Sequence, residues 1–521
     1  MRRRLAAALA LLMLVAVGCG NRAGDTPADA TAGTETGESA SQEPVHIVVA
    51  QGADAVSLDP HKTNDQPSSR VMKQIYDTLV EQTEDLKLEP GLATKWTQID
   101  DVTWEFELRQ GVKFHNGETL TARDVKFTFD RLVNPETKAP AAFLLEPVQE
   151  VQVVDDYKVR IVLKYPFAPI LSHLAHTAAS ILNEKAVTEA GEDYGSKPVG
   201  TGPFKLVSWT KGSHIELERF DEYWGGPAKA QKLTFRSIPE GATRAIELET
   251  GAIDIAYNIE PQDYQRLQGD PNIQLTRDMT LSTNYIGFNL KKSPFDKVEV
   301  RQAINHAVNV DEIIEHILEN IGQKARGPIS PLVWGAHPDL KGYEYNPEKA
   351  KELLAKAGYP NGFETTLWTN DNPVRVKIAE KVQADLAKIG VNVKIEVVEW
   401  GQYLEDTAAG KHDMFILGWV TVTGDADYGL YPLFHSSQHG SPGNRTFYTN
   451  PRVDELLDKG RQSSNPEERL QAYREAQELI TADAPWLFLN VGEEVTGLGK
   501  TVKGFVPHPA GHHRLKDVTK E

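Results

Sequence analysis

Cysteine is the scarcest informative residue in this 521-residue sequence, which contains one, Cys19. A single thiol excludes disulfide bonds within the chain. After the N-terminus no apolar run approaches the about 18 residues that a membrane-spanning helix needs. Basic residues are outnumbered, 56 against 74 acidic residues, and no basic cluster follows positions 2–4. This balance argues against nucleic acid as a partner and against electrostatic binding to anionic lipid.

Motifs of the common enzyme classes are also missing. We find no P-loop, no HExxH zinc motif, no GxSxG nucleophile turn and no paired CxxC. The glycine-rich stretch 200–203 contains proline and lacks a third glycine, which favours a tight turn over a dinucleotide site. His508, His512 and His513 near the C-terminus have no metal-ligand spacing, and we expect them to be solvated. We therefore expect no catalysis, no metal and no cofactor.

The one cysteine follows a short apolar segment. Three arginines at 2–4 and the apolar run 5–17 have the form of a secretory signal peptide, predicted at 1–18. Residues 16–19, Ala-Val-Gly-Cys, resemble the bacterial lipobox, in which the cysteine is acylated and becomes the first mature residue. The resemblance implies lipid on Cys19 and attachment to a membrane. Ordinary secretion, with an unmodified thiol at the cleavage site, is the alternative.

The segment after the cysteine is predicted to be a tether. Residues 20–43 contain no aromatic or large aliphatic side chain. Such a composition cannot bury enough apolar surface to fold. A flexible coil of this length reaches about 25–30 Å root-mean-square. We therefore expect 19–44 to hold a folded body clear of a membrane surface.

Hydrophobic periodicity in the folded body alternates between strand and helix spacing. TWEFEL at 103–108 alternates apolar and polar residues, which is typical of a half-buried strand. Thr121 and Asp124 have capping-box spacing at the start of a helix. Further on, the sequence predicts strands and helices in turn: strands at 365–369, 391–400 and 414–419, and helices at 347–357 and 373–389. Strand–helix–strand crossovers of this kind predict an α/β fold with a mainly parallel sheet.

Two of these predicted strands end in tryptophan, Trp400 and Trp419. The second runs into a predicted polar loop, 420–431, that carries Asp425, Asp427 and Tyr428. Ligands of open α/β sheets bind beyond the carboxyl ends of strands. Aromatic walls beside fixed acceptors suit a small ligand with a peptide-like body and a cationic end. The alternatives are that the tryptophans belong to the core and that the aspartates form a solvated turn.

Long segments of the chain resemble family 5 of the extracellular solute-binding proteins, the dipeptide, oligopeptide, glutathione and nickel-binding group of ABC importers. The resemblance covers essentially all of 45–505. The segments that carry it, in the family's order, are LRQGVKFHNGETLTARDVKFTFDRL (108–132), VGTGPFKLVSWTKGSHIELERFDEYWGG (199–226), NYIGFNLKKSPFDKVEVRQAINHAVNVDEII (284–314), YNPEKAKELLAKAGYPNGF (345–363) and DMFILGWVTVTGDADYGLYPLFHSS (413–437).

The resemblance implies a type II, two-lobe hinged binding fold with an extra subdomain in the first lobe. Lobe I would run over 45–283, with the inserted subdomain at about 80–215, and lobe II over 286–488. The chain would return to lobe I over 490–521. It would cross between lobes near Tyr285, which we add to the candidate ligand-binding residues.

The resemblance also implies residue roles. The tryptophan matching Trp400 lines the ligand groove in peptide-binding relatives, as does the segment matching 57–65. Those relatives hold the peptide ammonium with an aspartate two or three residues after the pair matching Gly418 and Trp419. Here Thr421 and Val422 occupy those positions. Either Asp425 or Asp427 takes over, or the ammonium clamp is absent.

A carboxylate partner is expected at Arg445, because a guanidinium pairs bidentately with a carboxylate; an exposed Arg445 is the alternative. The implied function is capture of a short peptide or glutathione-like ligand by lobe closure. Delivery would be to a membrane permease with a separate ATPase. A nickel chelate, an oligosaccharide or an opine is the alternative ligand. We expect a monomer in the cell envelope, lipid-anchored to the outer face of the cytoplasmic membrane or in the periplasm.

Overall fold

The computed structural model describes residues 44–441 and 443–521. The predicted signal peptide, Cys19 and the tether up to residue 43 lie outside the described residues. Within the described ranges no helix has the length and apolarity to cross a membrane.

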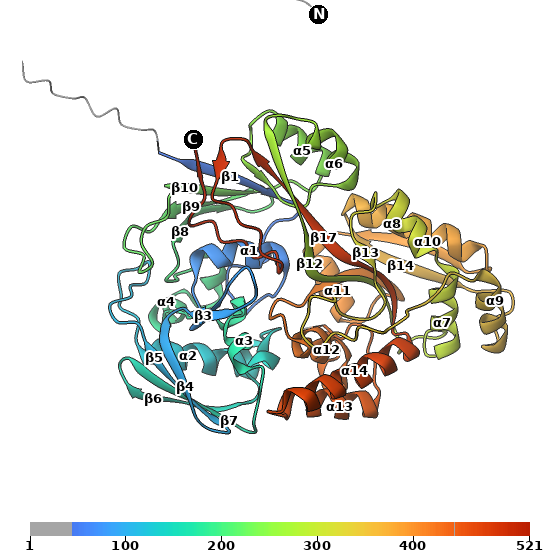
Figure 1. The fold of residues 1–521 in the computed structure, drawn as a ribbon, viewed down its shortest axis with the longest axis horizontal. Helices are drawn as coiled ribbons and strands as arrows, with labels where there is room; N and C mark the ends of the chain where they lie inside the picture. Colours follow the sequence, from blue (N-terminus) through green and yellow to red (C-terminus); the bar gives the residue numbers. More distant parts are fainter. Residues whose placement is uncertain (1–43, 442) are drawn as a thin grey trace, which may run out of the picture. The chain divides into compact units, whose positions relative to one another are not determined.

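An 11-stranded mixed sheet organises the described chain (Figure 1). Its strand order is β15-β14-β16-β12-β17-β11-β1-β10-β9-β8, with β13 paired to β17. The bounds are β1 His46–Gln51, β8 Phe204–Thr210, β9 His214–Arg219, β10 Lys232–Ser237, β11 Ile255–Ala256, β12 Ile273–Phe288, β13 Gln323–Lys324, β14 Glu364–Asn370, β15 Asn392–Val398, β16 Met414–Val420 and β17 Trp486–Gly499. We call the side built on β1 and β8–β11 lobe I, and the side built on β14–β16 lobe II.

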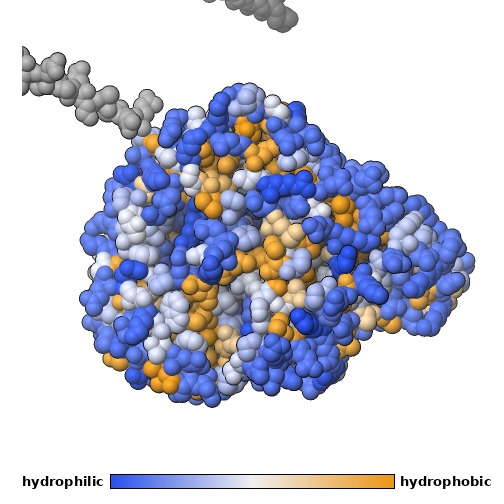
Figure 2. Space-filling view, in the orientation of Figure 1, coloured by the Kyte–Doolittle hydropathy of each residue, from blue (hydrophilic) through white to orange (hydrophobic). Residues whose placement is uncertain are grey.

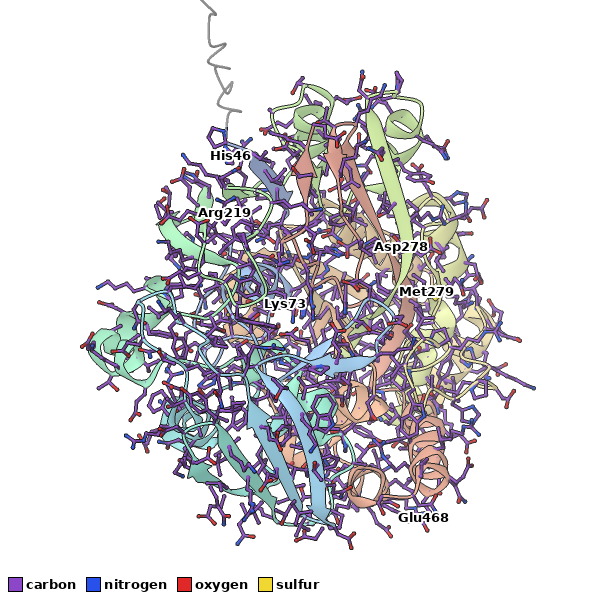
Figure 3. The ribbon with its side chains drawn as sticks, turned by 60° about the vertical axis from the view of Figure 1, so that its left-hand side comes forward. His46, Lys73, Arg219, Asp278, Met279 and Glu468 are labelled. Carbon is purple, nitrogen blue, oxygen red and sulfur yellow. The ribbon has the colours of Figure 1, made fainter. Side chains whose placement is uncertain are left out.

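The long antiparallel strands β12 and β17 belong to both lobes, and Figure 1 shows them side by side at the centre. On lobe I, β17 continues the sheet through Leu498, which pairs with Ile255 of β11. On lobe II, β12 pairs with β16 from Ser282 onward. The register of β12 on β17 shifts between Met279 and Thr283, and Figure 3 labels Met279 at the start of this shift. The register shifts again between Asn284 and Tyr285, so the two lobes are joined through a paired ribbon with two irregular places.

Lobe II follows the predicted strand and helix alternation closely. Strand β14 pairs in parallel with β15 and with β16, although the strands β12 and β17 beside them run antiparallel. Helix α10 (Pro373–Ala387) packs on β14 and β15, and helix α9 (Pro347–Lys356) contributes buried residues to the same core cluster. Ile378, Val382 and Leu386 of α10 are buried in one cluster with Met414 and Ile416 of β16. The amphipathic spacing of α10 is thus the reason that it lies on this sheet.

A separate four-stranded sheet lies within the residues predicted to form the subdomain. Its order is β4-β5-β7-β6, with β4 Ala93–Asp100, β5 Thr103–Leu108, β6 Val148–Asp155 and β7 Lys158–Leu163. Helix α2 (Ala122–Val133) packs on it and begins with the predicted capping box of Thr121 and Asp124. The predicted insertion, 80–215, extends into β8 and β9, which are hydrogen-bonded in the large sheet. The domain boundaries stay a prediction.

Three predicted local features are wrong. Residues 426–431 of the predicted polar loop 420–431 belong to helix α12 (Ala426–Phe434), which is buried on every side. The strand predicted at 391–400 ends at Val398, and Trp400 instead begins helix α11 (Trp400–Ala408). The three C-terminal histidines expected to be solvated are buried. They are buried because side chains of α1 (Gln66–Ile75) bind the backbone there: Gln66, Arg70 and Gln74 donate to carbonyls of 510, 511 and 513.

The remaining elements surround these layers. Their bounds are β2 Val80–Gln82, β3 Leu88–Pro90, α3 Ile170–Leu174, α4 Glu184–Ala190, α5 Gly241–Glu249, α6 Pro261–Gln268, α7 Val298–Ala307, α8 Val310–His316, α13 Pro451–Gln462, α14 Pro466–Asp483, β18 Val502–Lys503 and β19 Thr519–Lys520.

Candidate functional site

A cavity of about 310 Å³ lies between the lobes, beside the register shift of β12. Lobe I contributes the start of α1 and the C-terminal segment 509–512, and lobe II contributes the end of β16 and the start of α11. Figure 2 shows apolar residues gathered near the middle of this face of the molecule, between strongly polar outer surfaces. Ligand cavities of about 300–1,000 Å³ are typical of small-molecule sites.

Aromatic side chains form part of the cavity wall. Trp400, Trp419 and Tyr428 all line it. Trp419 Nε1 donates to the carbonyl of Tyr428 (2.9 Å), and their rings lie 5.1 Å apart. Trp400 Nε1 reaches Asp65 Oδ2 of lobe I at 3.5 Å, the outer limit of a hydrogen bond. The platform predicted from the sequence is therefore assembled from both a strand end and a helix start.

Two arginines of lobe II line the same cavity. Arg375 Nη1 donates to Asn370 Oδ1 (3.0 Å), and no ion pair of Arg375 occurs among the described residues. Arg445 is buried, and its Nε donates to Thr407 Oγ1 (3.1 Å). Burial lowers the pKa of both guanidiniums, because desolvation disfavours the charged form. They form a positive region on the lobe II wall.

Asp65 places a carboxylate on the opposite wall. It is the N-cap of α1, accepts from Thr63 Oγ1 (2.6 Å) and from the Ser68 N–H (3.3 Å), and is buried. Within the described chain no cation lies within ion-pair distance of it. Burial raises the pKa of Asp65, with its hydrogen bonds acting in the opposite direction. From the sequence only the segment 57–65 was expected to line the groove, and Asp65 itself was not singled out, although Asp-Gln-Pro-Ser is a typical helix start.

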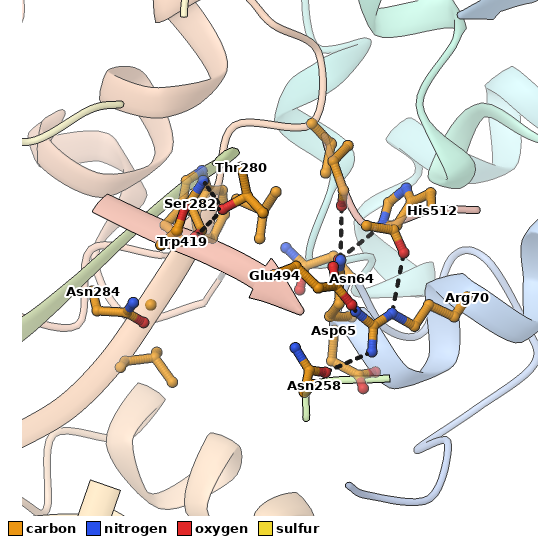
Figure 4. A pocket seen from close by; sticks show the side chains of 18 of the residues that line it. Asn64, Asp65, Arg70, Asn258, Thr280, Ser282, Asn284, Trp419, Glu494 and His512 are labelled. Carbon is orange, nitrogen blue, oxygen red and sulfur yellow. Dashed lines mark hydrogen bonds and ion pairs between the residues drawn. The ribbon is translucent and has the colours of Figure 1, made fainter. Parts of the chain in front are cut away.

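A charged network fixes the lobe I wall (Figure 4). Arg70 donates from Nη1 to Asn258 Oδ1 (2.9 Å) and from Nε to the Gly511 carbonyl (3.1 Å), and its Nη2 binds Glu494. Burial alone would raise the pKa of Glu494, but the Arg70 charge and His513 outweigh it, and the pKa is lowered to about 2. Arg70 is thus compensated internally, in contrast to Arg375.

The remaining predicted residues lie behind the wall. Asp425 accepts from Arg469 Nη2 (2.8 Å), and Asp427 lies 3.3 Å from Arg461 Nε. Tyr285 stacks on the core residue Trp486 at 3.5 Å between ring centroids. These three residues do not line the cavity within the described chain. For the two aspartates helix α12 is the reason, because Asp425 caps it and the helix carries Asp427 into the interior.

A second cavity of about 340 Å³ adjoins the first. The two share lining residues from both lobes, including Arg70, Asn284, Arg375, Trp400 and Gly492. No group of histidine, cysteine or acidic side chains that could hold a metal ion occurs in residues 44–441 and 443–521. The site offers charge, hydrogen bonds and aromatic surface to a ligand between two lobes.

Two lobes joined by a strand ribbon and enclosing such a cavity define a hinged ligand-binding protein. The chain belongs to the bacterial extracellular solute-binding proteins, family 5, whose middle-region model matches residues 87–441. It is 35% identical over 474 residues to the glutathione-binding protein GsiB of Pectobacterium atrosepticum, covering 89% of this chain and 91% of that one. The family resemblance and the two-lobe α/β fold predicted from the sequence are thereby confirmed.

Solved structures give the same relationship. The periplasmic binding protein DppA of Helicobacter pylori, in complex with the peptide STSA, superposes with a TM-score of 0.87 at 36% identity, covering 92% of this chain and 99% of that one. The dipeptide-binding protein of Pseudoalteromonas sp. SM9913, in complex with Met-Leu, gives 0.88 at 27% identity, covering 91% and 100%.

Proposed function

We propose that this protein captures a short peptide or a glutathione-like ligand between its lobes and delivers it to the permease of an ABC importer. The observation that carries the proposal is the division of charge across the cavity: Arg375 and Arg445 on lobe II face a site whose lobe I wall holds Asp65. A zwitterionic ligand matches this arrangement. The binding named for the relatives, glutathione and short peptides, supports the same ligand class.

Each charged end of the ligand has an oppositely charged partner in the cavity wall. Its carboxylate pairs with Arg375, supported by Arg445, because guanidinium and carboxylate form bidentate hydrogen bonds. Its ammonium binds Asp65, whose buried carboxylate gains most from an added positive charge. Trp400, Trp419 and Tyr428 pack against the ligand body. Asp425, Asp427 and Tyr285 hold the wall from behind.

Closure follows from these contacts. A ligand that bridges both lobes has more interactions in the closed form than in the open one, so it shifts the population toward the closed form by that difference. The closed form then docks on the permease, and a separate subunit hydrolyses ATP. Lipid on Cys19 keeps the monomeric protein at the membrane, with 20–43 as its tether.

A thermal-shift panel on the protein from residue 20 onward tests the proposal. The panel holds dipeptides and tripeptides, their N-acetyl and C-amide forms, both redox forms of glutathione, nickel with histidine, and oligosaccharides. A ligand at about 100 times its Kd adds about 2.7 kcal/mol of stability. We expect free peptides or glutathione to raise Tm and the blocked forms to do so less. A response only to nickel with histidine or to sugars would replace the peptide proposal with the alternative ligand class.

A further inference from the structure

The second cavity has walls suited to one ligand side chain. Its aliphatic part is formed by lobe II residues of α10 and β16 with neighbouring strand and loop positions, among them Val374, Ile378 and Ile416. It meets the first cavity at Arg375 and Trp400, which line both. A ligand whose carboxylate is held at Arg375 therefore has the second cavity beside its carboxyl-terminal residue.

The lobe I end of the second cavity contains polar side chains with unused hydrogen-bonding capacity. Gln51, Arg244 and Glu260 line it and are each at least nine-tenths buried. Gln51 Oε1, Arg244 Nε and Glu260 Oε1 have no hydrogen-bond partner among the described residues. A buried polar group left without a hydrogen-bond partner is destabilising. Three of them at one cavity indicate partners supplied from outside the chain.

The other atoms of these side chains are already engaged. Gln51 Nε2 donates to the Pro67 carbonyl (3.3 Å), which fixes its oxygen as the free atom. Arg244 donates from Nη1 to the carbonyl of Ile238 (2.7 Å) and from Nη2 to that of Asn258 (2.9 Å). Glu260 Oε1 lies 3.9 Å from Arg244 Nη2, too far for a hydrogen bond. Two acceptors and one donor therefore remain.

We propose that the second cavity is a side-chain subsite for an amide-bearing carboxyl-terminal residue, such as glutamine, of the peptide ligand. A primary amide offers two N–H donors to Gln51 and Glu260 and one oxygen to Arg244 Nε, and the methylene groups of glutamine contact the aliphatic wall. A glutamate side chain of the same size lacks the donors and meets the Glu260 carboxylate. Burial raises the pKa of Glu260, and the Arg244 charge 3.9 Å away acts in the opposite direction. This inference rests on the proposed peptide function.

Two isosteric dipeptides, Ala-Gln and Ala-Glu, test the subsite by calorimetry at pH 7, with Ala-Ala as the reference ligand. We expect the intact protein to bind Ala-Gln at least about tenfold more tightly than Ala-Glu, since like charges brought together in an interface are strongly disfavoured. In Glu260→Gln the ratio should fall below about threefold while the Kd of Ala-Ala is unchanged. The matched control is Asp263→Asn on the same helix, which removes an equal charge at a residue outside the second cavity lining.

Each outcome decides the matter. Equal binding of the two dipeptides, or an unchanged ratio in Glu260→Gln, overturns the subsite while leaving the peptide function standing. A loss of preference in Asp263→Asn as large as in Glu260→Gln also overturns it, because the effect would then be one of general charge. If Glu260→Gln folds poorly, Gln51→Leu serves in its place and should weaken Ala-Gln alone. Failure of every peptide to bind removes both the function and the subsite.

Discussion

At the scale of the residue, the same side-chain type has different roles according to its neighbours. Arg70 and Arg375 both line the cavities, but Arg70 is bound to Glu494, whereas Arg375 has an amide oxygen of Asn370 as its hydrogen-bond partner. Because the charge of Arg70 is already compensated, its role is to order the lobe I wall of the cavity. A charge held by a neutral group can still gain a carboxylate from a ligand.

We expect Arg375→Met to weaken binding of free peptides by about 2–5 kcal/mol, the range for removing one partner of a buried charge pair. Peptides with an amidated carboxyl end should lose much less. Calorimetric titration of both peptide forms measures the difference. Arg452→Met at an exposed ion pair is the matched control, and equal losses for free and amidated peptides would contradict the assigned role.

Asp65→Asn separates binding from stability. Asparagine caps a helix about as well as aspartate, so we expect the free energy of unfolding to change by no more than a few tenths of a kcal/mol. Loss of the negative charge should weaken binding of free peptides by about 2–5 kcal/mol. N-acetyl peptides should bind the variant and the parent equally. Titration together with urea unfolding measures both quantities, and an unchanged Kd for free peptides would remove Asp65 from the site.

At the scale of the element, a cluster of buried charges joins the subdomain to lobe II. His173 Nε2 of α3 lies 3.2 Å from Asp427 Oδ2 of α12. Arg461 of α13 reaches both oxygens of Asp427, with Nε 3.3 Å from Oδ1 and Nη2 3.4 Å from Oδ2. All three side chains are almost fully buried. The aspartate that the sequence suggested as a ligand contact thus sits between elements of different parts of the chain.

We expect Asp427→Asn to destabilise the ligand-free protein by about 3–5 kcal/mol, because it leaves the buried Arg461 charge uncompensated. The matched control is Asp130→Asn in an exposed i,i+4 pair with Lys126, where a loss of about 0–1 kcal/mol is expected. Urea unfolding of both variants gives the comparison. Equal midpoints for the two would show that the buried cluster contributes little.

Elements with clear periodicity were predictable from the sequence, and elements buried on all sides were not. α10 has an amphipathic stripe and α2 has its capping box, so both were placed correctly. α12 was missed because its nine residues are all buried and include Pro432, leaving no polar face to reveal a helical period. Burial of His512 depends on Gln66, 446 positions away, and such long-range contacts cannot be read from local patterns.

The candidate site shows the same division. Trp400, Trp419, Tyr428 and Arg445 were proposed from local sequence and the family resemblance, and all line the cavity. Arg375 was not proposed, because within its sequence neighbourhood it is one more basic residue on an amphipathic helix. Its position is decided by the packing of α10 against the sheet. The roles of these residues stay a prediction until ligands are measured.

At the scale of the whole molecule, buried neutral histidines predict sensitivity to acid. Burial lowers their pKa from 6.5 to about 3 for His61, His176, His412 and His508, and to about 4 for His115. Between these values and pH 6.5 the unfolded chain binds protons that the folded chain does not. Stability therefore falls as the pH drops below about 6.5.

Buried carboxyl groups modify this trend in both directions. Glu494, with its pKa lowered to about 2, adds a further loss of stability below about pH 4.5. Carboxyl groups whose pKa is raised by burial act in the opposite direction: Asp77, to about 6, and also Asp65, Asp124, Glu260 and Asp425. We expect the five histidines to outweigh them. We expect Tm to fall steadily from pH 7 to pH 4.5, as measured by calorimetry in buffers of matched ionic strength. A flat Tm over this range would contradict the burial of neutral histidines.

The continuity of β12 and β17 through both lobes has a consequence for ligand range. We expect a ribbon of two paired strands, with register shifts between Met279 and Thr283 and between Asn284 and Tyr285, to bend at these shifts more easily than it slides, since sliding would break the ladders on either side. The direction in which the lobes close would then be the same for every ligand. A longer ligand would then not be accommodated by a larger distance between the closed lobes. It would have to extend into an adjoining cavity and displace water there. The range of ligands that the protein accepts would accordingly be decided by the shape of its cavities, while the hinge is the same for every ligand.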